Sequence, residues 1–286
     1  MTEAMEDLAT YYAGISRDGG LISKCEMWLP PMLEGATVLD IECRRGKGVY
    51  KLSEHVGQSG QALGVDTDAA FIEDAIAHEA ENLVRNHLTV SNMCFRQAFP
   101  ENLAAAGIED GSVDVVNVNS WLNLAYDRVQ VLREIYRVLK PGGEFYHAGL
   151  FVDNPYDSAA RAKALTDGDA YGTATTFDAF CADMAQAGFD NYFVIDGGGN
   201  QPIGGRWNRD GRHFSPLVIR SFKLAGSADG PGRNVVYQGG IPPFLGAFVL
   251  DDAHSYPAGT PVATDAATAR VFTESRYAAA FAVADR

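Results

Sequence analysis

Hydrophobic and polar positions follow two different rhythms along the chain. Short apolar runs, rich in β-branched residues, alternate with longer stretches in which apolar residues recur every three or four positions. The first pattern is typical of buried strands and the second of amphipathic helices. Strands are predicted at 37–41, 62–68, 113–124 and 144–151, and helices at 48–57, 69–83, 127–140 and 175–189. Asp68 is the expected N-cap of the helix at 69–83. Sustained alternation of this kind predicts an α/β fold in which helices wrap a parallel sheet.

The pattern changes after about residue 195. Two glycine-rich segments, 196–205 and 226–234, flank an apolar run at 213–224, and glycine clusters of this kind mark turns or loops. We therefore predict three parts. They are an N-terminal cap at 1–34, a Rossmann-like domain at 35–195 and a smaller C-terminal α+β domain at 196–286.

Composition narrows the class of protein. The chain has 286 residues, of which 47% are hydrophobic, and a formal net charge of -14. An acidic chain is a poor match for nucleic acid, which needs a basic face. The sequence contains no apolar run of about 18 residues and begins with an acidic segment, so we expect no membrane association and a cytoplasmic location. The four cysteines are scattered without a paired spacing, which favours reduced thiols.

Candidate binding residues follow the predicted strands. In a doubly wound sheet the ligand lies at the carboxyl ends of the strands. The residues expected there as cofactor-binding are Asp40, Arg44, Arg45, Gly46, Lys47, Asp66, Thr67, Phe99, Glu101 and Asn119. An acid at the end of the second strand suits a ribose diol, because a carboxylate accepts both hydroxyl hydrogens. The position of Asp66 therefore indicates a nucleoside site, although an aspartate in such a loop also serves as a turn residue.

The chain resembles the arsenite S-adenosylmethionine methyltransferases. The resemblance rests on "VLDIECRRGKGVYKLSEHVGQSGQALGVD", on "IEDGSVDVVNVNSWLNLAYDRVQVLREIYRVLKPGGEFYHAGLF" and on the C-terminal "VVYQGGIPPFLGAFVLDDAHSYPAGTPV". It covers nearly the whole chain from about Tyr11 onward, and the C-terminal part makes it specific. It implies that residues 35–195 form a Rossmann-like class I methyltransferase-type domain that binds S-adenosylmethionine, and that the C-terminal α+β domain helps to close the substrate site.

Two family motifs are altered in this chain. The first loop of the family runs D-x-G-C/S-G-x-G, whereas here Glu42 and Arg44 replace two of the glycines. The resemblance also implies three cysteines that hold trivalent arsenic. Cys25 occupies one of these positions, but Ser120 and Ala170 occupy the other two. A hydroxyl and a methyl group cannot replace soft thiolates, so we do not expect arsenite methylation by the family mechanism.

Three interpretations of the altered loop remain open. In the first, the protein still binds S-adenosylmethionine and methylates another small molecule. In the second, the scaffold holds an anionic small molecule and carries out other chemistry, because Arg44, Arg45 and Lys47 stand at a helix N-terminus that favours anions. In the third, the protein is a catalytically inactive binding subunit. An exposed turn with paired arginines would explain the basic cluster equally well.

The candidate catalytic residues are His147, Cys25 and Ser120. We expect His147 at the end of the fifth strand, where an imidazole could act as a general base or bind a metal. His213 is a second metal candidate if the C-terminal region folds over the crevice, with Asp153 or Asp157 nearby in sequence. A structural histidine and a packed cysteine are the competing explanations.

Overall fold

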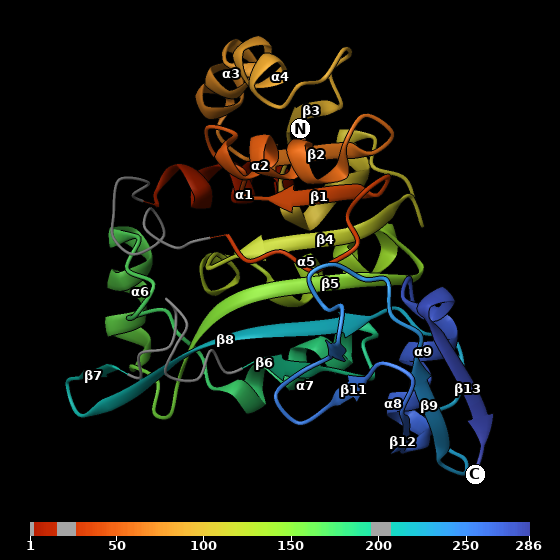
Figure 1. Cartoon of the computed structure of the whole chain (residues 1–286). Coiled ribbons are helices and arrows are strands. Elements are labelled where there is room, and N and C mark those ends of the chain that lie inside the picture. The colour runs from red at the N-terminus through yellow and green to blue at the C-terminus, as the bar shows by residue number, and fades with distance from the viewer. Residues whose placement is uncertain (1–2, 16–26, 196–206) are drawn as a thin grey trace.

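A mixed eight-stranded sheet organises the chain. The computed structural model describes residues 3–15, 27–195 and 207–286 (Figure 1). The strands of this sheet are β1 (Thr37–Ile41), β2 (Gln61–Asp66), β3 (Met93–Gln97), β4 (Val113–Asn119), β5 (Leu139–Val152), β6 (Phe193–Ile195), β7 (Trp207–Arg209) and β8 (Arg212–Phe222). Their order is β3-β2-β1-β4-β5-β8-β6, with β7 paired to β8. Strands β1 to β5 are parallel, and β8 is antiparallel to β5.

Helices cover both faces of the sheet. The helices of the described residues are α1 (Glu3–Ala13), α2 (Lys47–Val56), α3 (Ala69–Ala77), α4 (Glu79–Arg85), α5 (Arg128–Val138), α6 (Ser158–Asp167), α7 (Phe177–Ala187), α8 (Ala266–Ala269) and α9 (Val271–Glu274), with short 3-10 turns at η2 (Pro100–Ala106), η3 (Leu122–Leu124) and η4 (Ala278–Ala280). Apolar residues of α2 and α3 pack on one face. Those of α1, α5 and α7 pack on the other. This two-sided burial explains why the central strands are almost continuously apolar.

The structure confirms the α/β fold class with its parallel central strands. It also confirms Asp68 as the N-cap of α3, where the side chain accepts a hydrogen bond from the Ala70 N–H. The helix expected at 69–83 is divided at His78 into α3 and α4, and two strand boundaries differ from expectation by five residues. β4 ends at Asn119, because Ser120 turns the chain with φ of 54°. β5 begins at Leu139, so the helix before it ends sooner than we expected.

The apolar run at 213–224 was expected in the C-terminal region, but it lies in the main sheet. Its strand β8 pairs with β5 over nine positions, from Glu144 opposite Phe222 to Val152 opposite Phe214. Antiparallel pairing with the last parallel strand buries this run on both faces, which local periodicity does not reveal.

The C-terminal residues form a separate small layer beside the sheet. β9 (Arg233–Tyr237) lies between β12 (Pro261–Thr264) and β13 (Phe281–Asp285), and β10 (Ala247–Val249) pairs with β11 (Ser255–Pro257). Strands β9, β12 and β13 lie at the lower right of Figure 1. Their aromatic core also includes Phe193 and Phe222 from the main sheet, which joins the two parts. Within the described residues, no helix has the length and apolar character needed to cross a bilayer.

Candidate active-site crevice

The loop after β1 keeps the backbone shape of a glycine-rich loop, although two of its residues are not glycine. Glu42, Arg44 and Gly46 lie in the left-handed region, with φ of 63°, 49° and 80°. This conformation costs a residue other than glycine about 1–2 kcal/mol, so surrounding contacts must hold it. A Cβ at Gly46 would come within 2.8 Å of the Tyr50 ring, which explains why this position is glycine.

Asp66 holds the loop from the end of β2. Its Oδ2 accepts a hydrogen bond from the Arg44 N–H at 2.9 Å, and its Oδ1 accepts one from the Asp68 N–H at 2.8 Å. The residue is 1% exposed. Beside it, the carbonyl of half-buried Thr67 accepts a hydrogen bond from the Gln97 side chain. The acid that the sequence marks as nucleoside-binding therefore also fixes the strained loop.

Asp40 lies beneath the same loop and packs against the first turn of α2. A Cβ on Gly48 of that turn would come within 2.2 Å of Asp40 Oδ2, so only glycine permits this approach. Burial raises the pKa of Asp40 to about 7. The base of the crevice therefore holds a carboxyl group that titrates near neutral pH.

The basic side chains of the loop are directed at α3. The guanidinium carbons of Arg44 and Arg45 lie 5.5 and 5.0 Å from the centre of the Phe71 ring. Arg45 also pairs with Asp74 at 3.3 Å and is 62% exposed, and Lys47 is exposed. The arginines that we considered for an anion site are therefore partly engaged by a helix surface.

Two buried acceptor atoms at the carboxyl edge of the sheet lack a donor among the described residues. They are Oε2 of Glu101, after β3, and Oδ1 of Asn119, at the end of β4. An unsatisfied buried acceptor costs about 1–3 kcal/mol, so such atoms indicate a ligand that brings N–H or O–H donors. S-adenosylmethionine carries an ammonium group, a ribose diol and an adenine amine. The residues of the crevice therefore fit this cofactor.

An aromatic stack from three segments closes the same edge. The ring of Tyr12 in α1 lies 5.9 Å from those of Phe99 and Trp121, with interplanar angles of 18° and 25°. The Tyr12 hydroxyl donates to Glu101 Oε1 at 2.6 Å, and burial raises the pKa of Glu101. Trp121 is 2% exposed, so it belongs to the core rather than to an open pocket floor.

His147 lies in the core and not at the crevice. β5 continues five residues beyond it to Val152, and its ring stacks on Phe180 of α7 at 5.3 Å. Nδ1 lies 3.0 Å from the Val118 carbonyl oxygen. Burial lowers the pKa of His147 to about 4, so the imidazole is neutral at pH 7. These contacts describe a structural histidine.

This burial predicts a dependence of stability on acid. Between pH 6.5 and 4 the unfolded chain protonates His147 while the folded chain does not, so stability falls as the pH falls, by up to roughly 3 kcal/mol. We expect His147→Phe to remove this loss in urea titrations at pH 4.5 and 7. Exposed His55 provides the control variant His55→Asn, which should keep the wild-type slope. An unchanged slope in His147→Phe would contradict the assignment.

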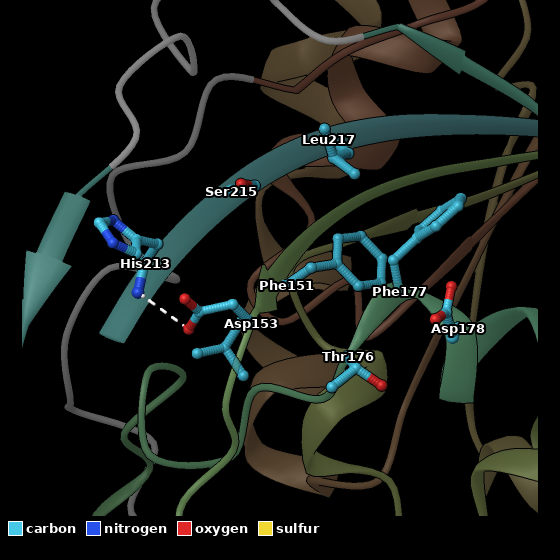
Figure 2. Close-up of a pocket in the computed structure, with 9 residues that line it drawn as sticks. Phe151, Asp153, Thr176, Phe177, Asp178, His213, Ser215 and Leu217 are labelled. Carbon is cyan, nitrogen blue, oxygen red and sulfur yellow. Dashed lines mark hydrogen bonds between the residues drawn. The ribbon is translucent and has the colours of Figure 1, made fainter. Parts of the chain in front are cut away.

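A pocket of about 700 Å³ lies at the end of β5 and the start of β8. Figure 2 shows Phe151, Phe177 and Leu217 on its apolar side and Asp153 with His213 at one end. The His213 N–H donates to Asp153 Oδ1 at 3.0 Å. The β8 pairing thus brings His213 to the carboxyl edge of the sheet.

The structure separates the two histidines that we considered for a metal. Val152 pairs with Phe214, whereas His147 pairs with Ile219. His213 therefore lies six residues from the position opposite His147, which is about 20 Å along the strands. Among the described residues no group of three or more His, Cys, Asp or Glu side chains could hold a metal ion.

Three positions are those at which the family resemblance implies arsenic-binding cysteines, namely Cys25, Ser120 and Ala170. Cys25 lies outside the described residues. Ser120 is half-buried, with its N–H donating to the Ala148 carbonyl at 2.7 Å. Ala170 is 7% exposed, in the turn after α6. At these two described positions the structure offers no sulfur ligand for arsenic.

The strand order, the loop after β1 and the acid at the end of β2 are those of a Rossmann-like methyltransferase fold. A model of the methyltransferase domain matches residues 33–190, and a model of the arsenite methyltransferase C-terminal domain matches residues 231–286. Arsenite methyltransferase from Aquipseudomonas alcaligenes is 33% identical over 266 residues, which is 90% of this chain and 75% of that protein. The mouse arsenite methyltransferase is 29% identical, over 96% of this chain and 71% of that protein.

Structural comparison agrees with the sequence matches. The crystal structure of CrArsM, an arsenic (III) S-adenosylmethionine methyltransferase from Chlamydomonas reinhardtii, superimposes with a TM-score of 0.83 at 30% identity. The match covers 98% of this chain and 95% of that one. The chain belongs to the arsenite methyltransferase family, which confirms the resemblance that the sequence motifs indicated.

Proposed function

We propose that this protein transfers a methyl group from S-adenosylmethionine to a small organic molecule other than arsenite. The observation that carries the proposal is the loop after β1, which keeps three left-handed residues despite the side chains of Glu42 and Arg44. Strain of this kind persists where function requires the backbone shape. When bound, the cofactor supplies an electrophilic methyl group on a sulfonium.

Residues around the crevice would hold the cofactor by its donors. Glu101 and Asn119 each offer a buried acceptor atom without a donor among the described residues. Asp66 has both oxygens engaged by backbone N–H groups, but each carboxylate oxygen accepts more than one hydrogen bond. The protein would then contribute mainly proximity and orientation.

The acceptor molecule would occupy the pocket at the end of β5. Its apolar wall of Phe151, Phe177 and Leu217 suits an organic body, and Asp153 and His213 supply polar groups at one end. The family resemblance implies that arsenite methyltransferases hold arsenic with cysteine thiolates at the positions of Ser120 and Ala170. A hydroxyl and a methyl group do not bind soft arsenic, which supports a different acceptor.

Calorimetric titration with S-adenosylmethionine and S-adenosylhomocysteine tests whether the protein binds this cofactor. We expect micromolar binding, and for the double variant Glu42→Gly/Arg44→Gly an affinity within about threefold of wild type. The reason is that the Arg44 side chain lies over Phe71 and the loop already has the backbone shape that glycine would give. Arg45→Ala is the matched control, because it removes a charge from the loop without changing a left-handed position.

The outcomes separate the interpretations. Binding only by the double glycine variant would mean that the side chains exclude the cofactor and that the scaffold has been put to another use. No binding by either protein would overturn methyl transfer altogether. Methylated arsenic formed from arsenite would contradict the proposed choice of acceptor, but not the use of the cofactor.

A further inference from the structure

A second cavity, of about 970 Å³, lies away from the crevice. Its walls come from residues 27–33, from Arg220 of β8 and from residues 242–252, and Lys51 and His55 of α2 stand at its side. Cavities of this size and mostly apolar lining are typical of small-molecule sites. The proposed methyl transfer assigns it no role.

The wall formed by residues 27–33 is fixed in place from two sides. Arg276 donates to the Pro31 carbonyl at 2.8 Å and also to the Met32 carbonyl, and it pairs with Glu144 at 3.0 Å. On the other side, Lys51 Nζ donates to the Met27 carbonyl at 3.2 Å. The cavity is therefore bounded by anchored backbone, which makes it a preformed site.

The lining combines apolar surface with hydrogen-bond donors. Trp28 packs on Tyr146 and Val218, and Phe244 and Val249 line the cavity with it. Two donors among the lining residues have no hydrogen-bond acceptor within the described part of the chain, namely Trp28 Nε1 and Arg220 Nη2. A ligand with acceptor oxygens would remove the free-energy cost of leaving these buried donors without hydrogen bonds.

The charge beneath the cavity is positive. Two guanidinium groups, Arg220 and Arg276, share one carboxylate, that of Glu144, at 2.7 and 3.0 Å. Arg220 is 1% exposed and Glu144 is fully buried, so solvent screens this excess weakly. Lys51 adds a further positive charge at the side of the cavity, and Asp252 a negative one.

We propose that this cavity binds a small carboxylic acid with an apolar aromatic or aliphatic body. A carboxylate supplies acceptors only, which matches unpartnered donors and a net positive surround. The apolar body would lie against Trp28, Phe244 and Val249.

The register of the sheet shows that this site is distinct from the crevice. Asp40, Asn117, Tyr146 and Arg220 are successive partners across β1, β4, β5 and β8, so they stand in one row on the face that α2 covers. Three strand spacings separate Asp40 from Arg220, which is about 14 Å. A ligand in the cavity would therefore leave the cofactor loop free, and the inference does not depend on methyl transfer.

Titration of the full chain with 1-naphthoate and with the neutral 1-naphthalenemethanol tests the proposal. We expect the acid to bind at least about tenfold more tightly than the alcohol, because a charged acceptor strengthens the hydrogen bonds. Trp28→Phe removes the indole N–H but keeps an aromatic ring, and it should weaken binding of the acid about fivefold. S-adenosylhomocysteine should not compete.

A pair of tryptophan variants controls for the location. Val249→Trp fills the cavity and should abolish binding, whereas Leu245→Trp adds the same side chain at a position 69% exposed in the same segment and should not. Equal affinity for acid and alcohol would overturn the carboxylate assignment. Binding that survives Val249→Trp, or no binding of the acid by the wild-type protein at millimolar concentration, would overturn the site.

Discussion

Replacing Glu144 by alanine should lower the free energy of unfolding by about 3–5 kcal/mol, the largest effect that we expect from a single substitution. The Glu144 carboxylate is fully buried. It accepts hydrogen bonds from Arg220 at 2.7 Å, Arg276 at 3.0 Å and the Tyr277 hydroxyl at 2.6 Å. Without it, the Arg220 guanidinium would be buried with no ionic partner.

Urea unfolding at pH 7 measures this effect. The matched control is Asp167→Ala, which breaks an exposed pair with Lys163 and should cost less than about 1 kcal/mol. The network joins β5 and β8 to the C-terminal layer, so Glu144→Ala should also loosen contacts around α9. A loss below 1 kcal/mol for Glu144→Ala would mean that water reaches Arg220 and that the network is not closed.

The fold was largely predictable because its signals are local. The apolar run of β1, the helical face of α2 and the cap at Asp68 each lie within a few residues, and the structure contains all three. β8 was misplaced because its partner is β5, more than 60 residues away. Pairing between distant segments depends on tertiary packing, which periodicity does not encode.

The crevice was predictable in place but not in detail. Topology alone puts Asp66 and Asn119 at the carboxyl edge, and the structure has them there. His147 was expected at the same edge, but β5 runs on to Val152, so the imidazole falls in the middle of a strand. The contact of Tyr12 with Glu101 spans 89 positions, and no local pattern indicates it.

The second cavity gave no sequence signal at all. Trp28, Arg220 and Phe244 come from three segments with unrelated patterns. A buried arginine is unusual enough to attract attention, but burial itself is known only from the fold. The sequence therefore indicates the crevice, because family motifs mark it. It gives no indication of the second cavity, which no family motif marks.

The pH dependence of Asp40 gives the second large effect. In the unfolded chain an aspartate ionises near pH 3.9, whereas burial raises the pKa of Asp40 to about 7 in the folded chain. Between these values the unfolded state loses its proton and the folded state keeps it. Stability is therefore fully present below about pH 4 and falls as the pH rises to 7, by roughly 4 kcal/mol in all.

Asparagine cannot ionise, so Asp40→Asn should not lose stability in this way. Its free energy of unfolding should increase relative to that of the wild-type protein as the pH rises from 5 to 8. Urea unfolding at pH 5, 6, 7 and 8 follows the difference between the two proteins, and exposed Asp167 supplies the control variant Asp167→Asn. A difference that stays constant over this range would mean that Asp40 is ionised throughout in the folded protein. The increasing difference in the free energy of unfolding that we expect would mean that the Asp40 carboxyl group under the cofactor loop is neutral in mild acid. Ligand affinity at the crevice should therefore change over the same pH range.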